Sequence, residues 1–389
     1  MAEDARIAHE LHKRFSFIHG PFVDVGRRLH LTRRDQTPRA WALVAIAWCP
    51  LAVSALISVC LGHEPDRLLR DVSLHARLLV ALPILILGDR LLARRCHMAV
   101  ERLYGEDIVD PAALDPIISR AERMRDLRAA LLVMVVVALA IGQLTLWRFG
   151  GAGIVTARES HFDVSFARIW YTLIALPMVN LLLLHWLWQW AIWSYVVIKV
   201  ARLKLGLVAT HPDGAGGIGF LAAPINPFAV SLSGVMTVLS SSWANQILLG
   251  TETLQSFIPG FVVVVLFSFA FACGPFLAYV PVLANLRVTH ALRYSELALH
   301  YTQGFHAKWV EAGPPKTSEL LGTADIQSLN DLIGAYGSLV TTRVVPVNKT
   351  KLLALAAALV LPVLPLSIVT MSVDEILMRL GKMLLGLRG

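Results

Sequence analysis

Residues 41–61, WALVAIAWCPLAVSALISVCL, contain no charged side chain. The hydrocarbon core of a membrane is about 30 Å thick, and a helix of about 20 apolar residues crosses it. Because lipid offers no hydrogen bonds, such a segment must pair its own N–H and C=O groups, as an α-helix does. We therefore predict that residues 41–61 form a transmembrane helix.

Further apolar runs follow along the whole chain. They cover residues 74–92, 129–147, 169–200, 228–249, 257–286 and 352–371. The chain is 56% hydrophobic and only 16% charged, whereas soluble domains carry about 25% charged residues. We predict an all-α fold, a polytopic transmembrane helical bundle of about seven spans.

Basic residues are unevenly distributed among the segments that join these runs. Most of the 35 Lys and Arg residues lie in alternate segments, residues 1–39, 90–128, 199–225 and 286–351. Cytoplasmic loops carry such an excess, so we predict that these segments and the N-terminus are cytoplasmic. Seven spans then place the C-terminus outside, unless the run that contains Pro362 and Pro365 is re-entrant.

This topology divides the chain into regions. A cytoplasmic amphipathic segment at 1–39 precedes the bundle of six spans, 40–286, which includes cytoplasmic helices at 97–127 and a glycine-rich loop at 205–225. Residues 287–349 are predicted to be a cytoplasmic helical region, and 350–389 the last span with an amphipathic C-terminal helix. Ser372 and Glu375 form a capping box before that helix. It is expected to lie in the membrane interface or to pack on the bundle.

The fifth run is more polar than the others. Ser233, Thr237, Ser241 and Asn245 recur every four residues and share one helix face, which Gln246 widens. A water-lined or ion-lined route needs such a face. Close helix packing with hydrogen bonds between helices needs it equally. We take these five residues as candidate pathway-lining residues and keep packing as the alternative.

Other polar groups also fall within the runs. His185 and Asn180 lie on the fourth run. His185 is a candidate proton relay, because histidine titrates near physiological pH, or alternatively a buried histidine with satisfied hydrogen bonds. Asp89 and Arg90 close the second run, where we expect an interfacial charge cluster. Ionisable residues at membrane depth are functional candidates by default.

The sequence THPDGAGGIGF at residues 210–220 joins the fourth and fifth runs. Its glycines permit close backbone approach and unusual backbone conformations. Three interpretations stay open: a nest of backbone N–H groups for an anion, a gating loop, or a tight connector in which Asp213 caps its own turn. A Walker motif is excluded, because no Lys-Ser/Thr pair follows. The candidate gating residues here are His211, Asp213, Gly214, Gly216, Gly217 and Gly219.

Prolines interrupt several of the runs. Pro275 and Pro281 in the sixth run predict a bent element. Broken helices expose backbone groups at membrane depth, as they do around ion and substrate sites. Both prolines are therefore added to the gating candidates.

No catalytic residue, metal or cofactor is expected. The four cysteines, Cys49, Cys60, Cys96 and Cys273, form no C-x-x-C pair, so neither disulfides nor a zinc site is predicted. The motifs H-E-x-x-H and G-x-S-x-G are absent. The net charge of +8 is explained by basic cytoplasmic loops, so we expect no nucleic-acid partner and no enzyme.

Two motifs carry a resemblance to a known family. THPDGAGGIGFL at residues 210–221 and ADIQSL at 324–329 resemble motifs of a family of bacterial inner-membrane proteins of about this length. The resemblance covers most of the chain, including the region from Arg343 onward. It implies a location in the bacterial inner membrane and carries no activity with it.

Together these features favour an integral membrane channel or transporter for a small ion or solute. The fifth run would line its route beside the kinked sixth run. The alternative is a membrane scaffold or assembly protein without transport activity. The expected partners are the lipid bilayer, a small ion or solute and a second copy of the chain, since small residues permit close helix contacts.

Overall fold

The computed structural model describes residues 17, 20–28, 40–62, 69, 71–149, 166–311 and 324–369. Within this part of the chain all regular structure is helical and there is no β-strand. The predicted all-α class is confirmed. The predicted C-terminal amphipathic helix, which would follow Ser372, lies outside the described residues.

The helices follow one another with short connections. The first half contains α2 (Pro21–Arg28), α3 (Ala40–Cys60), α4 (Val72–His75), α5 (Leu82–Gly105), α6 (Pro111–Arg125), α7 (Arg128–Phe149), α8 (Phe166–Trp170) and α9 (Leu176–Val200). The second half contains α10 (Ile225–Leu248), α11 (Ile258–Cys273), α12 (Val280–His306), α13 (Asp325–Val340), α14 (Lys349–Val360) and α15 (Leu364–Val369). Short π-helical or 3₁₀ segments join several of them: η2 (Ala76–Ala81), η3 (Tyr171–Ala175), η4 (Gly219–Ala222), η5 (Leu254–Phe257), η6 (Gly274–Tyr279) and η7 (Ala307–Glu311).

Helix starts follow local side-chain chemistry. Asp110 accepts a hydrogen bond from Ala112 N at 3.0 Å, and Pro111 takes the first helical position of α6. Asn348 accepts from Lys351 N at 3.0 Å at the start of α14. Such caps satisfy backbone donors that have no partner within the helix. They fix where two helices of the bundle begin.

Five helical stretches of the described chain are long and apolar enough to cross a membrane, judged by length and composition. They are Ala40–Cys60, Phe166–Val200, Gly219–Leu248, Leu254–Glu311 and Lys349–Leu366. Helices α6 and α7, bent by 44° at their junction, add a sixth if they form one span. The predicted seven spans are therefore not confirmed. The run at 74–92 is helical but is not among the five, and it carries Arg77, Asp89 and Arg90.

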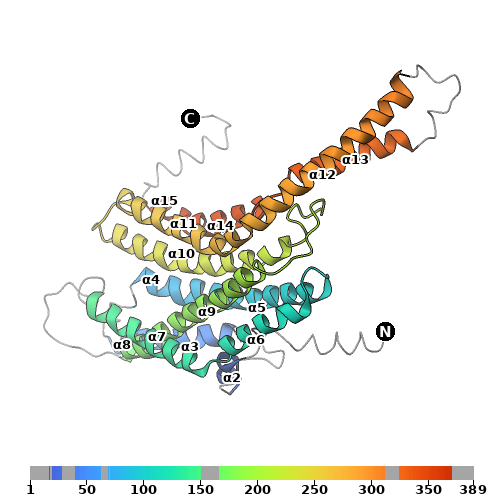
Figure 1. Ribbon diagram of the computed structural model, residues 1–389. Helices are drawn as coiled ribbons and strands as arrows, with labels where there is room; N and C mark the ends of the chain where they lie inside the picture. The colour runs from blue at the N-terminus through green and yellow to red at the C-terminus, as the bar shows by residue number, and fades with distance from the viewer. Residues whose placement is uncertain are drawn as a thin grey trace, which may run out of the picture.

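The helices form a layered bundle with one projecting arm (Figure 1). Helix α10 packs on α5 along one side and on α14 along the other, and α9 packs on α5, α6 and α7. Helix α12 continues far beyond the bundle, and α13 returns alongside it (Figure 1). At the far end of this arm, Lys308 Nζ and Trp309 Nε1 both donate to Asp325 Oδ2, at 2.7 and 2.9 Å.

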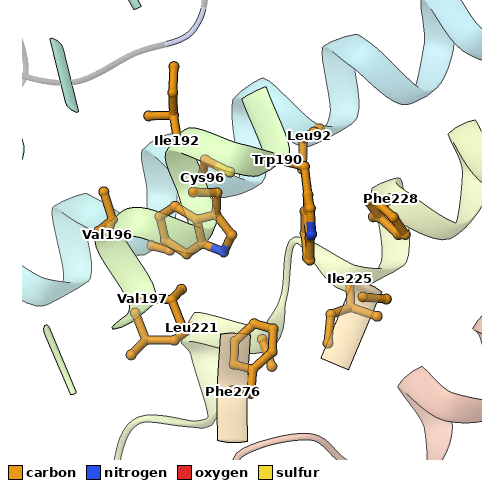
Figure 2. Packing of buried hydrophobic residues seen from close by; sticks show 14 of the residues in the cluster. Leu92, Cys96, Trp190, Ile192, Val196, Val197, Leu221, Ile225, Phe228 and Phe276 are labelled. Atoms are coloured by element: carbon orange, nitrogen blue, oxygen red, sulfur yellow. The ribbon is translucent and has the colours of Figure 1, made fainter. Parts of the chain in front are cut away.

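Aromatic rings fill the contact between α9 and α10. The Phe228 ring lies 4.7 Å from the Trp186 ring and 4.3 Å from the Trp190 ring, measured between centroids. Figure 2 shows Trp190 and Phe228 facing one another, with Phe276 of η6 in the same cluster. Trp190 Nε1 donates to the Phe271 carbonyl at 3.1 Å. Aromatic pairs of this kind add about 0.5–1.5 kcal/mol beyond their burial, so this layer stabilises the bundle.

A second apolar cluster joins α3, α4–α5 and α8–α9. His75 lies at its edge with both ring nitrogens engaged. Trp48 Nε1 donates to His75 Nδ1 at 3.1 Å, and His75 Nε2 lies 2.8 Å from the Leu69 carbonyl oxygen. Since Nδ1 accepts, Nε2 carries the hydrogen and donates it. His75 is thus held as the neutral Nε2–H tautomer in a structural role.

Two glycines bring α5 and α10 close together. A Cβ atom on Gly88 would lie 2.0 Å from Ser231 Oγ and 2.9 Å from Ser231 N. A Cβ atom on Gly234 would lie 3.2 Å from Leu85 Cγ and 3.3 Å from the Ala81 oxygen. Small residues allow such contacts between membrane helices. The α5–α10 contact fixes the position of α5 and hence of Asp89.

Candidate functional site

Asp89 and His185 meet inside the bundle. Asp89 lies on α5 and His185 on α9, and His185 Nδ1 is 2.9 Å from Asp89 Oδ1. Gln189 follows one turn later on the same face of α9, and its Nε2 donates to the same Asp89 oxygen at 2.8 Å. The His185 and Asp89 side chains are only 10% and 16% exposed. We call these three residues the Asp89 cluster.

The Asp89 cluster determines where hydrogens lie on His185. An ionised carboxylate only accepts, so His185 Nδ1 carries a hydrogen and donates it to Asp89. The other ring nitrogen, Nε2, makes no hydrogen bond to any described residue. It is therefore the position at which the ring gains or loses a second proton. This arrangement is the opposite of that at His75, where Nε2 is engaged.

A small cavity lies beside His185. It has a volume of about 20 Å³, and one water needs about 10–15 Å³ measured in the same way. Its walls come from α9, from α2 and from the junction of α6 and α7. Polar atoms at this cavity include Gln189 Oε1 and Trp188 Nε1, which are buried without a partner in the described chain. One water would satisfy this acceptor and this donor.

Helix α2 closes one side of the cavity. The Phe22 ring stacks on the His185 ring, with centroids 3.9 Å apart and an interplanar angle of 12°. Phe17, Gly20, Pro21 and Val23 also line the cavity. The aromatic face of Phe22 carries partial negative charge, which attracts a cation placed against it. Phe22 therefore covers one face of the His185 ring.

Arg90 does not join the Asp89 cluster, although it follows Asp89 directly. Successive helix residues point in different directions, and Arg90 is exposed whereas Asp89 is half-buried. The charged side chain that lines the cavity is Arg125 of α6, and it forms an ion pair with Asp126 at 2.8 Å. The expected interfacial pair of Asp89 and Arg90 is thus divided between the interior and the surface.

The polar face of α10 is satisfied largely within its own helix. Ser233 Oγ donates to the Val230 carbonyl at 2.7 Å, and Thr237 Oγ1 to the Ser233 carbonyl at 2.8 Å. Ser241 Oγ donates to the Val238 carbonyl at 2.9 Å. Their backbone carbonyl partners lie three or four residues earlier. These hydroxyl groups therefore bond to the helix that carries them, and none of them lines the cavity beside His185.

The remaining predicted pathway residues lie elsewhere. Asn180 Nδ2 donates to the Ala138 carbonyl at 3.3 Å and so joins α9 to α7. Gln246 Nε2 donates to the Ser242 carbonyl at 3.4 Å, and Asn245 is half-buried in the last turn of α10. The structure brings His185 together with Asp89 but not with these amides.

The glycine-rich loop is organised around Asp213. Its Oδ1 accepts from Ala215 N at 2.8 Å and from Gly217 N at 3.1 Å, and its Oδ2 accepts from Gly219 N at 2.8 Å. His211 Nδ1 lies 2.9 Å from Oδ1. These geometries support the tight-connector interpretation, because Asp213 itself uses the backbone donors that an external anion would need.

Electrostatics around Asp213 have two opposing causes. Partial burial raises the pKa of the Asp213 carboxyl, and the N–H groups of Ala215, Gly219 and Gly217 lower it. The net result is a pKa below the usual aspartate value. A carboxylate that accepts several backbone hydrogen bonds is stabilised in its charged form. Asp213 is thus a structural anion of the loop.

Three glycines give the loop its shape. Gly214, Gly216 and Gly217 have φ angles of 59°, 69° and 98°, a region that other residues rarely adopt. A Cβ atom on Gly216 would lie 3.1 Å from Leu286 Cδ2. Arg343 fastens the loop from the chain that follows α13, since its backbone N donates to the Gly214 carbonyl at 2.8 Å and its Nη2 to the Asp213 carbonyl.

Pro275 and Pro281 lie where we predicted a bend in the sixth run, at a change of helix type. Pro275 lies in the first turn of η6 and Pro281 in the first turn of α12. Proline lacks the N–H donor and is accommodated at a helix start. The chain therefore changes from α-helix to 3₁₀-helix and back at this point, close to buried Phe276 and Tyr279.

Phe22, Trp188 and Gln189 were not among the predicted site residues. Gln189 carries a usable signal, because its spacing of four from His185 places both on one face of α9. Trp188 carries a similar signal, because it lies three residues after His185 on the same helix. Phe22 carries none, since its place beside His185 depends on how α2 packs. Within the described residues, no group of three His, Cys, Asp or Glu side chains is arranged to hold a metal ion.

The fold and the Asp89 cluster define a class, a multi-pass α-helical membrane protein with an ionisable group in its interior. Comparison of the chain with family models, with curated proteins and with solved structures finds no match. Any function must therefore be argued from the geometry of this chain itself.

Proposed function

We propose that the protein is an integral membrane transporter or channel for a small ion or solute, and that the Asp89 cluster is its ion-handling site. The observation that carries this proposal is the Asp89–His185 contact of 2.9 Å between α5 and α9. The location that we propose is the bacterial inner membrane with a cytoplasmic N-terminus, because the basic segments alternate.

The cost of burying the cluster supports a functional role. A carboxylate or an imidazolium taken out of water loses several kcal/mol of solvation, which attraction between the two repays only partly. Leucine or phenylalanine at both positions would stabilise an apolar bundle without this loss. Ionisable groups are retained at membrane depth mainly where they serve ions, protons or substrates. The alternative route along α10 has weaker support, since its hydroxyl groups bond to their own helix.

Flux measurements on the purified chain in liposomes test the proposal. The panel should contain protons, Na⁺, K⁺, Cl⁻ and small carboxylates, each under an imposed gradient. We expect movement of at least one species and a loss of at least about tenfold in Asp89→Asn, because breaking a buried charge pair costs several kcal/mol. Asp331→Asn is the matched control, since that carboxylate lies on α13 and contacts Gln327. Absence of flux for the whole panel would contradict the proposal.

One observation favours the scaffold alternative. The arm formed by α12 and α13 exposes large apolar side chains: Leu292 is 69% and Ile333 is 61% exposed. Exposed apolar surface of this kind often marks an interaction site. A photo-crosslinking residue at position 292 or 333 would capture a stoichiometric protein partner in cells if the chain is a scaffold. Capture of lipid alone would count against that role.

A further inference from the structure

We propose that the ligand of the Asp89 cluster is the proton, which His185 Nε2 takes from a single water held in the cavity beneath α2. This inference rests on the proposed transport function and names the species that the site handles. It assigns His185 as the proton-carrying group and Asp89 as its positioning residue.

The size of the cavity selects the ligand. A volume of about 20 Å³ holds about one water molecule. A hydrated ion or an organic solute needs several times this space. A proton needs none beyond the water that delivers it. The cavity is therefore large enough for the water that would deliver a proton to His185.

The unpartnered polar atoms hold a water beside His185. Gln189 is only 1% exposed, and its Oε1 is buried without a hydrogen-bond partner in the described chain. Trp188 also lines the cavity, and its Nε1 donor is likewise buried without a hydrogen-bond partner in the described chain. Buried polar groups of this kind normally bind ordered water. A water that accepts from Trp188 keeps one hydrogen for Gln189 and the other for His185.

The hydrogen bonds define the proton transfer. His185 Nδ1–H stays on the ring and donates to Asp89 Oδ1 throughout. A proton passes from the water to Nε2, and the water regains one from bulk solvent, so an O–H bond breaks while an N–H bond forms. The protonated ring stays in contact with the Asp89 carboxylate and with the Phe22 ring, whose centroid lies 3.9 Å from that of His185. Release reverses the same steps.

The charged groups around His185 are few in the described structure. Asp89 faces it from α5. Arg125 lines the cavity from α6 and is paired with Asp126, while Asp24 of α2 is exposed. From α7 the cavity wall is apolar, formed by Ala130, Leu131 and Met134. Within the described residues, Asp89 is thus the anion in direct contact with the ring.

His75 provides a matched control. It is also a half-buried histidine near the start of the α4–α5 helix, but both of its nitrogens are engaged, by Trp48 and by the Leu69 carbonyl. It has no free nitrogen for a proton from water. His75→Gln therefore changes a histidine whose ring nitrogens are both engaged, without changing the proposed carrier.

The experiment measures proton entry into liposomes that contain the full-length protein and the trapped pH dye pyranine, with the membrane potential clamped by K⁺ and valinomycin. We expect loss of proton flux in His185→Gln and unchanged flux in His75→Gln. Asp89→Asn and Phe22→Leu should both reduce the proton flux, because each removes a contact that holds the His185 ring in place. The Phe22 variant keeps His185 and so remains informative if His185→Gln fails to fold.

Solid-state NMR of ¹⁵N-histidine in the same liposomes gives an independent measurement on the wild type. We expect one histidine signal, absent from His185→Gln, to change between the neutral and the protonated ring over the pH range in which the liposomes show proton flux. Flux of another ion without proton flux, or a His185 ring that does not titrate, would overturn the inference and leave the transport proposal standing. No flux of any ion would instead remove the proposed function.

Discussion

Asp213 illustrates how one side chain can set the structure of a loop. Its two oxygens accept from the backbone of Ala215, Gly217 and Gly219, and these donors occur because glycines adopt φ angles above 50° at Gly214, Gly216 and Gly217. Without the carboxylate, the buried N–H groups would lose their partners. An unpaired buried polar group costs about 1–3 kcal/mol, so the loop depends on this residue.

Replacement of Asp213 by asparagine should destabilise the protein in a pH-dependent way. The folded-state pKa of Asp213 is lowered, so its contribution is present above the unfolded value of about 4 and is lost as the pH falls through the folded value. At pH 7 we expect Asp213→Asn to unfold more easily by about 1–3 kcal/mol. Thermal unfolding in detergent at pH 7 and at pH 3–4 measures this. The difference should shrink at acidic pH.

Glu296→Gln is the matched control for that experiment. Glu296 is an exposed carboxylate on α12, and substitutions at exposed positions usually change stability by less than about 0.5 kcal/mol. A difference between wild type and Asp213→Asn that stayed constant down to pH 3 would contradict an electrostatic role. Equal melting of the two proteins at pH 7 would show that the loop does not need the carboxylate.

For single residues, the sequence identified Asp89 and His185 as candidates but did not predict the contact between them. Asp89 and His185 were both candidates, since charged or titratable groups are costly in lipid. Their pairing depends on how α5 packs against α9, because the two residues lie 96 positions apart in the sequence. The pattern of residues within one helix cannot show which residue of another helix it will contact. Asp213 was easier to predict, because the residues that it contacts lie within six positions.

Among the helices, the close packing of α10 against α5 depends on small residues. Gly234 faces Leu85 and the Ala81 carbonyl, while Gly88 of α5 faces Ser231. Close approach increases dispersion contacts, which drive helix association in lipid. The polar pattern of α10 predicted either a lined route or close packing between helices. The contacts at Gly88 and Gly234 are an example of close packing, whereas Ser233 and Thr237 bond to their own helix.

Substitution of Gly88 by alanine tests this contact. Its new Cβ atom would lie 2.9 Å from Ser231 N, a backbone atom that cannot rotate away. Overpacking of this kind costs about 1–3 kcal/mol, so we expect a lower melting temperature in detergent. Gly105→Ala is the control on the same helix, because nothing lies within 4 Å of its Cβ position. Equal stability of the two variants would show that α5 and α10 can separate without cost.

At the scale of the whole molecule, composition determined the class and left the span number open. Long apolar runs predicted helices correctly, since lipid permits little else. The number of spans was harder to predict, because a helix such as α5 carries Asp89 and Arg90 and yet packs inside the bundle. Burial by neighbouring helices replaces contact with lipid there. The arm of α12 and α13 likewise extends past the bundle (Figure 1).

The orientation of the molecule follows from α10. Its 24 residues give a length of about 36 Å, which exceeds the hydrocarbon core of about 30 Å. The loop before it contains exposed Lys204, and the turn after it contains exposed Thr251. A membrane-spanning α10 would place these two positions on opposite sides of the membrane. The basic residues near Lys204 predict that its side is cytoplasmic.

Cysteine labelling in cells tests that orientation. In a background in which the four native cysteines are replaced, Thr251→Cys should react with a membrane-impermeant maleimide in intact cells. Lys204→Cys should react only after the membrane is opened. The reverse pattern would place Lys204 outside the cell and contradict the predicted orientation. Labelling of both positions from one side would show that α10 does not span the membrane, and the proposed depth of the Asp89 cluster would then be wrong.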